Sequence, residues 1–389
     1  MKKQNSKTLP YTIRDINISD FKGIKNIEVK NLPSEAKWIF LTGENGYGKT
    51  SILQAIALGL AGIDQATVGV IEIPHNPEIC VTLNNGEKYE VNERSFEKIF
   101  KQSRDESNYF KRLACYGSSR LDTYSESSQR VDKNSNISNL FSSQSLLENI
   151  ELKLSRWYAK QDITEFRNKY ETTRKLLMDL LDLYDLKVDI NTDKVTYIEQ
   201  DEEGNPFSPV DFSQLASGYK SIIATMGDMI LRLFEAYPEN YDPRQLSAIV
   251  IIDELDLHFH PKWQKRLPGL FSKYFPNIQF VASTHSPIPL LGAPRGSVFL
   301  TVKRTQQEGI TVERLNHLES TLSTMTPNLL LDSPIFGYAD LFSSQFRKNQ
   351  YIKTETTTEE VEMNEKIQSK LKKGLSDEKK KQLSKYLKS

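Results

Sequence analysis

The sequence predicts an α/β fold with a mixed sheet, a β-rich N-terminal lobe and a helical insertion. Two observations support this prediction. A glycine-rich loop at residues 43–50 lies between an apolar run and a helical pattern, and a second apolar run at residues 248–252 ends in two acidic residues. Strand and helix patterns alternate around both points, which is typical of a sheet covered by helices.

The N-terminal third contains short apolar runs with the length and composition of strands. They lie at residues 12–18, 27–29, 38–41, 79–83, 89–91 and 113–116. The pair at 79–83 and 89–91 is predicted to form a hairpin, because Asn85 and Gly86 favour the positive backbone angles of a tight turn. Residues 51–60, directly after the glycine-rich loop, are good helix formers and predict a helix.

The middle of the chain has a different character. Residues 122–139 are polar and rich in serine, which predicts a mobile loop. Between residues 146 and 184 the apolar side chains recur at helical spacing. Even one continuous helix of this length would span only about 60 Å. We therefore expect a helical insertion and not the arm of a long coiled-coil protein.

A second α/β pattern follows the insertion and ends near Leu300. Residues 328–342 are apolar enough to dock on the core. The tail from Lys353 carries acidic residues followed by many lysines. A solvated helix is the favoured interpretation of this tail, and an arm that binds nucleic acid is the alternative.

Composition excludes several classes of protein. The 51 basic residues balance the 51 acidic residues, so no global attraction to nucleic acid is expected. The two cysteines, Cys80 and Cys115, have no disulfide or metal-site spacing, which fits a reducing compartment. Neither an apolar leader nor an 18-residue apolar run occurs. We expect a cytoplasmic protein without a membrane partner.

Residues 43–50 match the phosphate-loop pattern G-x-x-x-x-G-K-[ST] in its required position between a strand and a helix. Glycines let the backbone amides turn toward phosphates, and the helix N-terminus adds its dipole. Lys49 is expected to reach the β and γ phosphates of ATP, and Thr50 to hold Mg²⁺. The predicted nucleotide contacts are Gly43, Glu44, Asn45, Gly46, Tyr47, Gly48, Lys49, Thr50 and Ser51.

The apolar run at residues 248–252 delivers Asp253 and Glu254 at its carboxyl end. Ligands of open α/β sheets bind at this end of the strands. Asp253 is expected to organise Mg²⁺, and Glu254 to polarise the water that attacks the γ phosphate. Phosphoryl transfer depends mainly on positioning and charge stabilisation, which this pair of carboxylates provides.

Two more segments flank the acidic strand, and they carry a resemblance to a known family. Residues 214–221 read QLASGYKS and open a helix, and residues 281–286 read VASTHS. With the phosphate loop and the acidic pair, these segments resemble ABC-type ATPase heads, especially the SMC-like branch with the RecF and OLD families. The resemblance implies that Ser217 and Gly218 form a signature loop capping the ATP of a second subunit. It also implies that His285 senses the γ phosphate.

Within this resemblance, Glu254, His285 and Lys49 are the predicted catalytic residues. Residues 255–260, LDLHFH, resemble the D-loop of the OLD-like branch. A metal site is the weaker interpretation of the histidines, because no suitable cysteine or carboxylate set accompanies them. Those histidines are His258, His260 and His285.

The loop after residues 113–116 departs from the family, because it reads GSSRL where a Q-loop glutamine belongs. Gln129 and Gln144 are the nearest downstream glutamines, and the Q-loop assignment between them stays open. Arg120 in this loop is either a surface residue, the favoured interpretation, or a group that faces a phosphate or a partner.

The resemblance divides the chain into four parts. Residues 1–125 are the N-terminal half of the ATPase head, 126–200 the polar loop and helical insertion, 201–327 the C-terminal half of the head, and 328–389 the docked segment and charged tail. The residues after His285 contain no Asp-x-Asp pair. We therefore expect no fused nuclease of the OLD type.

The overall layout resembles the stand-alone ATPases of bacterial anti-phage systems, such as the PtuA proteins of Septu and retron systems and the PARIS ATPase. That resemblance implies a homodimer or higher homo-oligomer that controls a separately encoded HNH-type nuclease or toxin. A RecF-like repair ATPase that clamps nucleic acid directly is the alternative. An ATP subunit of a membrane transporter is disfavoured, because the signature does not read LSGGQ.

Overall fold

The computed structural model describes residues 8–63, 77–93, 95, 109–120, 137–143, 145–322, 325–331, 333 and 336. The chain divides into two compact units, Met1–Ala339 and Asp340–Ser389. All described residues belong to the first unit. The charged tail from Lys353 lies outside the described residues, as do both candidate Q-loop glutamines, Gln129 and Gln144.

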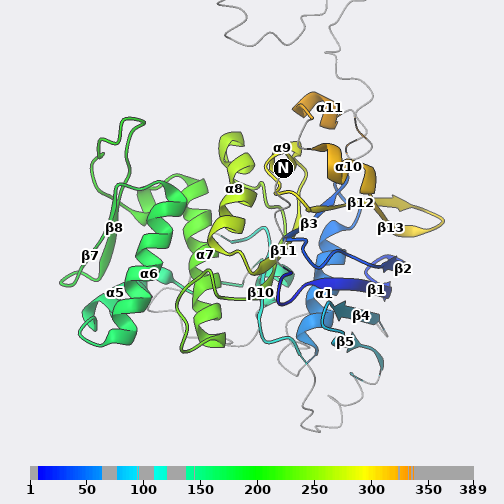
Figure 1. Cartoon of the computed structure of the whole chain (residues 1–389), viewed down its shortest axis with the longest axis horizontal. Helices are drawn as coiled ribbons and strands as arrows, with labels where there is room; N and C mark the ends of the chain where they lie inside the picture. Colours follow the sequence, from blue (N-terminus) through cyan, green and yellow to red (C-terminus); the bar gives the residue numbers. More distant parts are fainter. Residues whose placement is uncertain are drawn as a thin grey trace, which may run out of the picture. The chain divides into compact units, whose positions relative to one another are not determined.

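Within the described residues, ten strands form one mixed sheet (Figure 1). Their spatial order is β5 (Lys88–Val91), β4 (Glu78–Leu83), β1 (Ile13–Phe21), β2 (Ile24–Val29), β13 (Gly309–Arg314), β12 (Val298–Thr305), β3 (Trp38–Thr42), β11 (Ile278–Ser283), β10 (Ala248–Ile252) and β6 (Leu113–Tyr116). The strands from β12 to β6 run parallel, and the others pair antiparallel. The predicted mixed-sheet α/β fold is confirmed.

The central parallel strands are buried on both faces, which explains why their sequences are continuous apolar runs. Ile39 and Leu41 of β3 face the cluster that contains α1 (Lys49–Ala61). Trp38 and Phe40 face the opposite cluster, with α7 (Ser217–Ala236) and α8 (Pro261–Tyr274). The α1 and α7 helices therefore cover opposite faces of the sheet.

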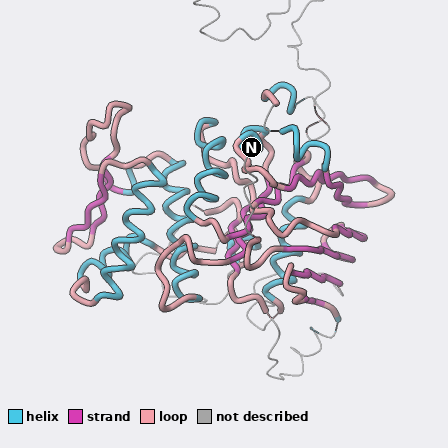
Figure 2. Tube along the Cα trace, viewed as in Figure 1, coloured by secondary structure: helices cyan, strands magenta, loops and turns pink. Residues whose placement is uncertain are grey.

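The helical insertion differs from the predicted single stretch. It forms two helices, α5 (Ile150–Ala159) and α6 (Thr164–Leu181), which pack against each other (Figure 2). A hydrogen-bonded turn around Lys160 separates them. The side chain of Asn149 accepts hydrogen bonds from the first amides of α5, which explains where that helix begins. Asp182, in a left-handed conformation, ends α6.

A small antiparallel sheet follows, and the sequence interpretation missed it. It consists of β7 (Asp185–Asp189), β8 (Lys194–Ile198) and β9 (Val210–Asp211). Buried side chains of β7 and β8, such as Leu186 and Tyr197, join the core that contains α5 and α6. Both strands alternate apolar and polar residues, but each has only five residues and follows a long helical pattern, so the alternation is a weak signal.

The remaining described helices are short: α4 (Ser138–Phe141), the 3₁₀ turn η1 (Phe212–Gln214), α9 (Pro287–Leu291), α10 (Asn316–Thr321) and α11 (Pro327–Leu331). The α4 helix lies in the last part of the predicted mobile loop, and burial of Ile137 and Leu140 accounts for its order. Leu330 of α11 is fully buried. Across the described part of the chain, every helix is too short or too polar to cross a bilayer.

Candidate nucleotide site

The glycine-rich loop joins β3 to α1, and two of its glycines are required by the backbone. Gly43 has φ +138°, and a Cβ atom there would lie 2.4 Å from the carbonyl oxygen of Val302 in β12. Gly48 has φ +96°, and a Cβ atom would lie 2.3 Å from a side-chain carbon of Ile310. The loop therefore packs against β12 and β13 at a distance that only glycine permits.

Lys49 begins α1, two residues before the predicted start, and is only 5% exposed. Its ammonium donates to the carbonyl oxygens of Gly43 at 2.8 Å and Glu44 at 2.9 Å. Burial lowers the pKa of Lys49 to about 8, although the acidic residues nearby oppose that shift. It remains protonated at neutral pH. A buried cation held by carbonyl dipoles fits an anionic phosphate.

Other residues of the loop make contacts that do not involve Lys49. The backbone carbonyl of Gly46 accepts a hydrogen bond from Arg304 of β12 at 3.2 Å, which braces the loop from the adjacent hairpin. A hydrogen bond to Glu44 raises the pKa of the Tyr47 hydroxyl. Asn45 is exposed, and Ser51 lies half-buried in the first turn of α1.

Thr50 and Asp253 meet in the folded chain. The Thr50 hydroxyl donates to Oδ2 of Asp253 at 2.7 Å, and the Ser283 hydroxyl donates to Oδ1 of the same carboxylate. The amide of Asp253 donates to the carbonyl of Tyr116 at 2.8 Å, which fixes the end of β10 against β6. A hydroxyl and a carboxylate are hard oxygen ligands, so this donor set fits Mg²⁺.

Glu254 follows Asp253 in a left-handed backbone conformation with φ +49°. For a residue other than glycine, this conformation costs about 1–3 kcal/mol. Its amide donates to the Ser283 hydroxyl at 2.8 Å, and its carbonyl accepts from Arg120 at 2.6 Å. Both the amide and the carbonyl of Glu254 are thus hydrogen-bonded, while its side chain is only half-buried.

Arg120 is not the surface residue that we favoured from the sequence. It is 2% exposed, and its guanidinium donates to carbonyl groups at the end of β10. Burial lowers the pKa of Arg120 to about 10, with the nearby acidic residues opposing the shift, so it stays charged at neutral pH. The alternative in which it faces a phosphate or partner is also wrong for the folded chain, because its polar groups bond within the protein.

His285 lies at the same edge of the sheet. Its Nδ1 is 3.2 Å from Nζ of Lys49. Burial and the charge of Lys49 lower its pKa, so the imidazole is neutral at pH 7. Since an ammonium can only donate, Nδ1 accepts and the imidazole proton resides on Nε2. The carboxylate of Asp256 holds the turn before the ring by accepting from the Thr284 hydroxyl at 2.5 Å.

The predicted signature residues lie apart from this cluster. Ser217 begins α7 and is exposed, and no hydrogen bond in the described part of the chain joins it to the phosphate loop. A Cβ atom on Gly218 would lie 3.3 Å from the carbonyl oxygen of His258 and 3.3 Å from the ring of Phe259. The signature residues thus pack beside residues 255–260 of their own chain. The imidazole of His260 accepts from the amide of Lys262 and caps α8.

Sequence reasoning gave no role to Asp256 and Ser283, and it favoured a surface position for Arg120, although all three residues hold this site. Ser283 ends β11, which pairs in parallel register with β10. Its position beside Asp253 could have been predicted from two apolar runs ending in polar residues. Asp256 and Arg120 carry no such signal, since each acts through a loop.

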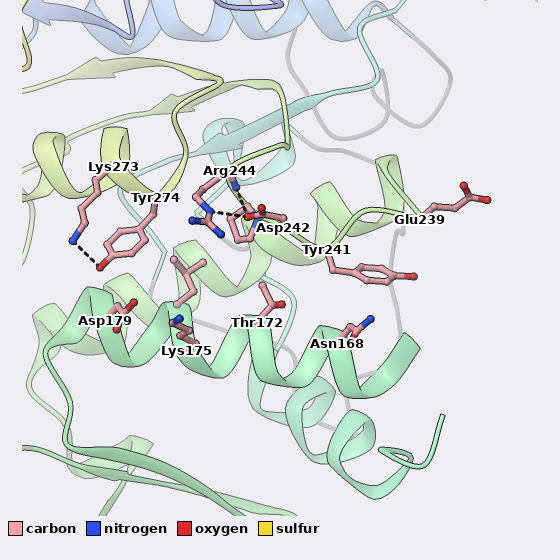
Figure 3. Close-up of a pocket in the computed structure, with 12 residues that line it drawn as sticks. Asn168, Thr172, Lys175, Asp179, Glu239, Tyr241, Asp242, Arg244, Lys273 and Tyr274 are labelled. Atoms are coloured by element: carbon pink, nitrogen blue, oxygen red, sulfur yellow. Dashed lines mark hydrogen bonds and ion pairs between the residues drawn. The ribbon is translucent and has the colours of Figure 1, made fainter. Parts of the chain in front are cut away.

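A separate pocket of about 760 Å³ lies between α6, the loop after α7 and the end of α8 (Figure 3). Lys175 and Asp179 of α6 face Lys273 and Tyr274 of α8 across it. Its three basic and three acidic side chains balance, so it presents no net charge to a ligand. None of the predicted site residues lines it.

The phosphate loop between β3 and α1, the acidic end of β10 and the histidine after β11 meet at one edge of a mixed sheet. Together they define a P-loop ATPase domain. The sequence profile of the family "AAA domain, putative AbiEii toxin, Type IV TA system" matches residues 39–288. The chain belongs to this family.

Several known proteins are similar to this chain. The Septu protein PtuA of Bacillus mycoides (strain KBAB4) is 29% identical over 346 residues, which is 84% of this chain and 45% of PtuA. The Retron Vc95 probable ATPase of Vibrio cholerae serotype O1 biovar El Tor is 43% identical over 83 residues, 21% of this chain and 16% of that protein. This chain thus spans less than half the length of these relatives. The expected relation to Septu and retron ATPases is confirmed.

Among solved structures, an Smc head bound to the C-winged helix domain of ScpA aligns with 78% of this chain and 97% of that chain. The sequence identity is 13% and the TM-score is 0.46.

Proposed function

We propose that this chain binds ATP with Mg²⁺ at the edge of the sheet formed by β3, β10 and β11 and hydrolyses it. The observation that carries this proposal is the convergence of Lys49, Thr50, Asp253, Glu254 and His285, which come from distant parts of the chain. Thr50 and Asp253 would hold the metal. When bound, Mg²⁺ neutralises phosphate charge.

The chain's own residues support a direct hydrolysis. Lys49 binds the β and γ phosphates. Glu254 accepts a proton from the water whose oxygen attacks the γ phosphorus, and the bond from that phosphorus to the bridging oxygen of ADP breaks. His285, with its proton on Nε2, donates to the γ phosphate and stabilises the charge that develops there. The products are ADP and inorganic phosphate.

We further propose that two heads engage across ATP. Ser217 and Gly218 would cap the nucleotide bound to the phosphate loop of a second copy. Support comes from the exposure of Ser217 and from its position on α7, which covers the sheet face opposite to α1. ATP binding would then favour the dimer, and hydrolysis would favour its release.

The cellular role that we propose is ATP-gated control of a separately encoded effector, either an HNH-type nuclease or a toxin, in anti-phage defence. Similarity to the Septu protein PtuA over 84% of this chain supports this proposal. Nucleic acid is a further candidate partner.

The test is affinity purification of the tagged chain expressed with its neighbouring genes, with and without ATP, followed by mass spectrometry. We expect a nuclease or toxin to co-elute in stoichiometric amount and its retention to depend on nucleotide. The Lys49→Ala variant is the control for that dependence. Recovery of the chain with nucleic acid alone, together with DNA-stimulated ATPase activity that falls steeply with salt, would instead favour the RecF-like alternative.

A further inference from the structure

Arg120 is the most completely enclosed basic side chain beside the candidate site. It lies in the loop after β6, and this loop is itself held in place. Asn139 accepts a hydrogen bond from the amide of Gly117 at 2.8 Å and donates to the carbonyl of Ser119 at 2.9 Å. A Cβ atom on Gly117 would lie 2.4 Å from the carbonyl oxygen of Asn139. The backbone that carries Arg120 therefore has little freedom.

The guanidinium of Arg120 joins two elements that the sequence treats as separate. Its Nη1 donates to the carbonyl of Asp253 at 2.6 Å, and its Nη2 donates to the carbonyl of Glu254 at 2.6 Å. Its Nε faces α7, where it donates to the Ser221 hydroxyl at 3.2 Å. Ser221 lies one turn after Ser217, the first residue of the signature helix. The Arg120 side chain thus contacts both the turn formed by Asp253 and Glu254, here called the acidic turn, and the signature helix α7.

We propose that Arg120 is a positioning residue that holds the Asp253–Glu254 turn in its hydrolytic conformation and couples this turn to the signature helix α7. The inference rests on the proposed ATP hydrolysis. The hydrogen bonds from Arg120 to Asp253 and Glu254 go to the backbone carbonyls and not to the carboxylates. Arg120 therefore influences the direction of the Glu254 side chain through the backbone.

The chemistry of the turn explains why arginine is needed. The left-handed conformation of Glu254 is disfavoured for a residue with a side chain, so external hydrogen bonds must hold it. The two carbonyls belong to consecutive residues, and a planar guanidinium presents donors in a fixed fork that matches such a pair. A lysine ammonium is a compact point charge and lacks this planar fork of donors.

A second buried contact connects α7 to β6, the strand that precedes the Arg120 loop. The carboxylate of Asp228 in α7 accepts from the Tyr116 hydroxyl at 2.9 Å and from the Glu148 amide at 2.9 Å. Tyr116 is the last residue of β6, the strand that precedes the Arg120 loop. A displacement of α7 by a second subunit would therefore reach Arg120 through Ser221 while the helix stays anchored at Asp228.

The test is Arg120→Lys in the full chain, measured by steady-state ATPase kinetics and by direct nucleotide binding. We expect kcat to fall by about 10²-fold, the scale for losing one preorganised catalytic contact, with nucleotide affinity changed by less than about threefold. Arg112→Lys is the matched control. Arg112 precedes the other end of β6, packs between the rings of Tyr11 and Tyr237, and should leave kcat unchanged.

Ser221→Ala provides a second variant that keeps the fork on the acidic turn and removes only the link to α7. We expect a smaller loss of kcat, and the double variant Ser221→Ala with Arg120→Lys should lose no more than Arg120→Lys alone. Additive losses would overturn the coupling to α7.

Wild-type kcat in Arg120→Lys would overturn the positioning role. A parallel loss of affinity and thermal stability with kcat would show a structural role only. If the wild-type chain itself does not hydrolyse ATP, the proposed function fails instead.

Discussion

Nζ of Lys49 lies 3.2 Å from Nδ1 of His285, although 236 positions separate the two residues. The register of the sheet explains this contact. Leu41 of β3 pairs with Ser283 of β11 in parallel, so the segments after both strands leave the sheet at the same edge. Burial, together with the charge of Lys49, lowers the pKa of His285 and so keeps the imidazole neutral.

Replacing Lys49 by alanine should abolish nucleotide binding, because the buried ammonium is the cation that would meet the β and γ phosphates. Titration calorimetry with ATP and Mg²⁺ would measure the loss. Lys25→Ala is the matched control, since Lys25 is exposed and bonds to the carbonyl of Gln307 in the β12–β13 turn. Retention of wild-type affinity by Lys49→Ala would exclude the phosphate loop as the binding site.

The Glu254→Gln variant should bind ATP normally and hydrolyse it about 10²–10³-fold more slowly, because glutamine cannot accept the proton of the attacking water. Because ATP is not cleaved, an ATP-bound dimer should accumulate. Light scattering coupled to size-exclusion chromatography would detect this dimer. The exposed Glu308→Gln serves as the control. Unchanged turnover in Glu254→Gln would remove Glu254 from catalysis.

Ser217→Arg should block the engagement of two heads while the monomer still binds ATP, because Ser217 is exposed at the start of α7 and arginine adds bulk and charge there. The measurement is the ATP-dependent change in molecular mass in the Glu254→Gln background. Ser208→Arg, an exposed serine in the preceding loop, is the control. An ATP-dependent dimer that survives Ser217→Arg would contradict the signature assignment.

Two glycines of the phosphate loop should respond differently to alanine. At Gly43 the new Cβ atom meets the Val302 carbonyl, so Gly43→Ala should lower the free energy of unfolding by about 2–4 kcal/mol and weaken ATP binding. At Gly46 nothing lies within 4 Å, and only the positive φ of +79° opposes alanine, at a cost of about 1–2 kcal/mol. Urea unfolding of both variants compares them, and equal losses would show that the contact with β12 is unimportant.

Stability should depend on pH through Glu151 of α5. Burial, with a smaller effect from Asp211, raises the pKa of Glu151 to about 7, while Tyr197 donates to its carboxyl group at 3.1 Å. The unfolded chain loses this proton near pH 4.3, so the free energy of unfolding should fall between about pH 4.5 and 7, by about 1–3 kcal/mol.

Glu151→Gln should remove this dependence and make the chain more stable than wild type at pH 8 but not at pH 5. Urea unfolding at both pH values measures the effect, with the exposed Glu171→Gln of α6 as the control. If wild type and Glu151→Gln show the same pH dependence, Glu151 is ionised in the folded chain.

The sequence alone was enough for the fold class and for the residues that meet at the sheet edge, for a physical reason. Buried parallel strands need continuous apolar runs, and the loop that would cradle phosphate needs glycine, lysine and threonine at set positions. Lys49 and Thr50 could be selected from their places in the phosphate-loop pattern, and Asp253 because it follows an apolar run directly. His285 was selected through the family resemblance.

Only the tertiary structure could identify the residues that contact the site from distant parts of the chain, because no local sequence pattern marks them. The sequence of the insertion predicted one helical stretch, whereas a hydrogen-bonded turn around Lys160 divides it into two helices that pack on α7, and a small sheet follows. Arg120 in a polar loop reads as a surface residue. Only the fold brings the carbonyls of Asp253 and Glu254 within reach of its guanidinium, since burial of a charge depends on partners more than a hundred positions away.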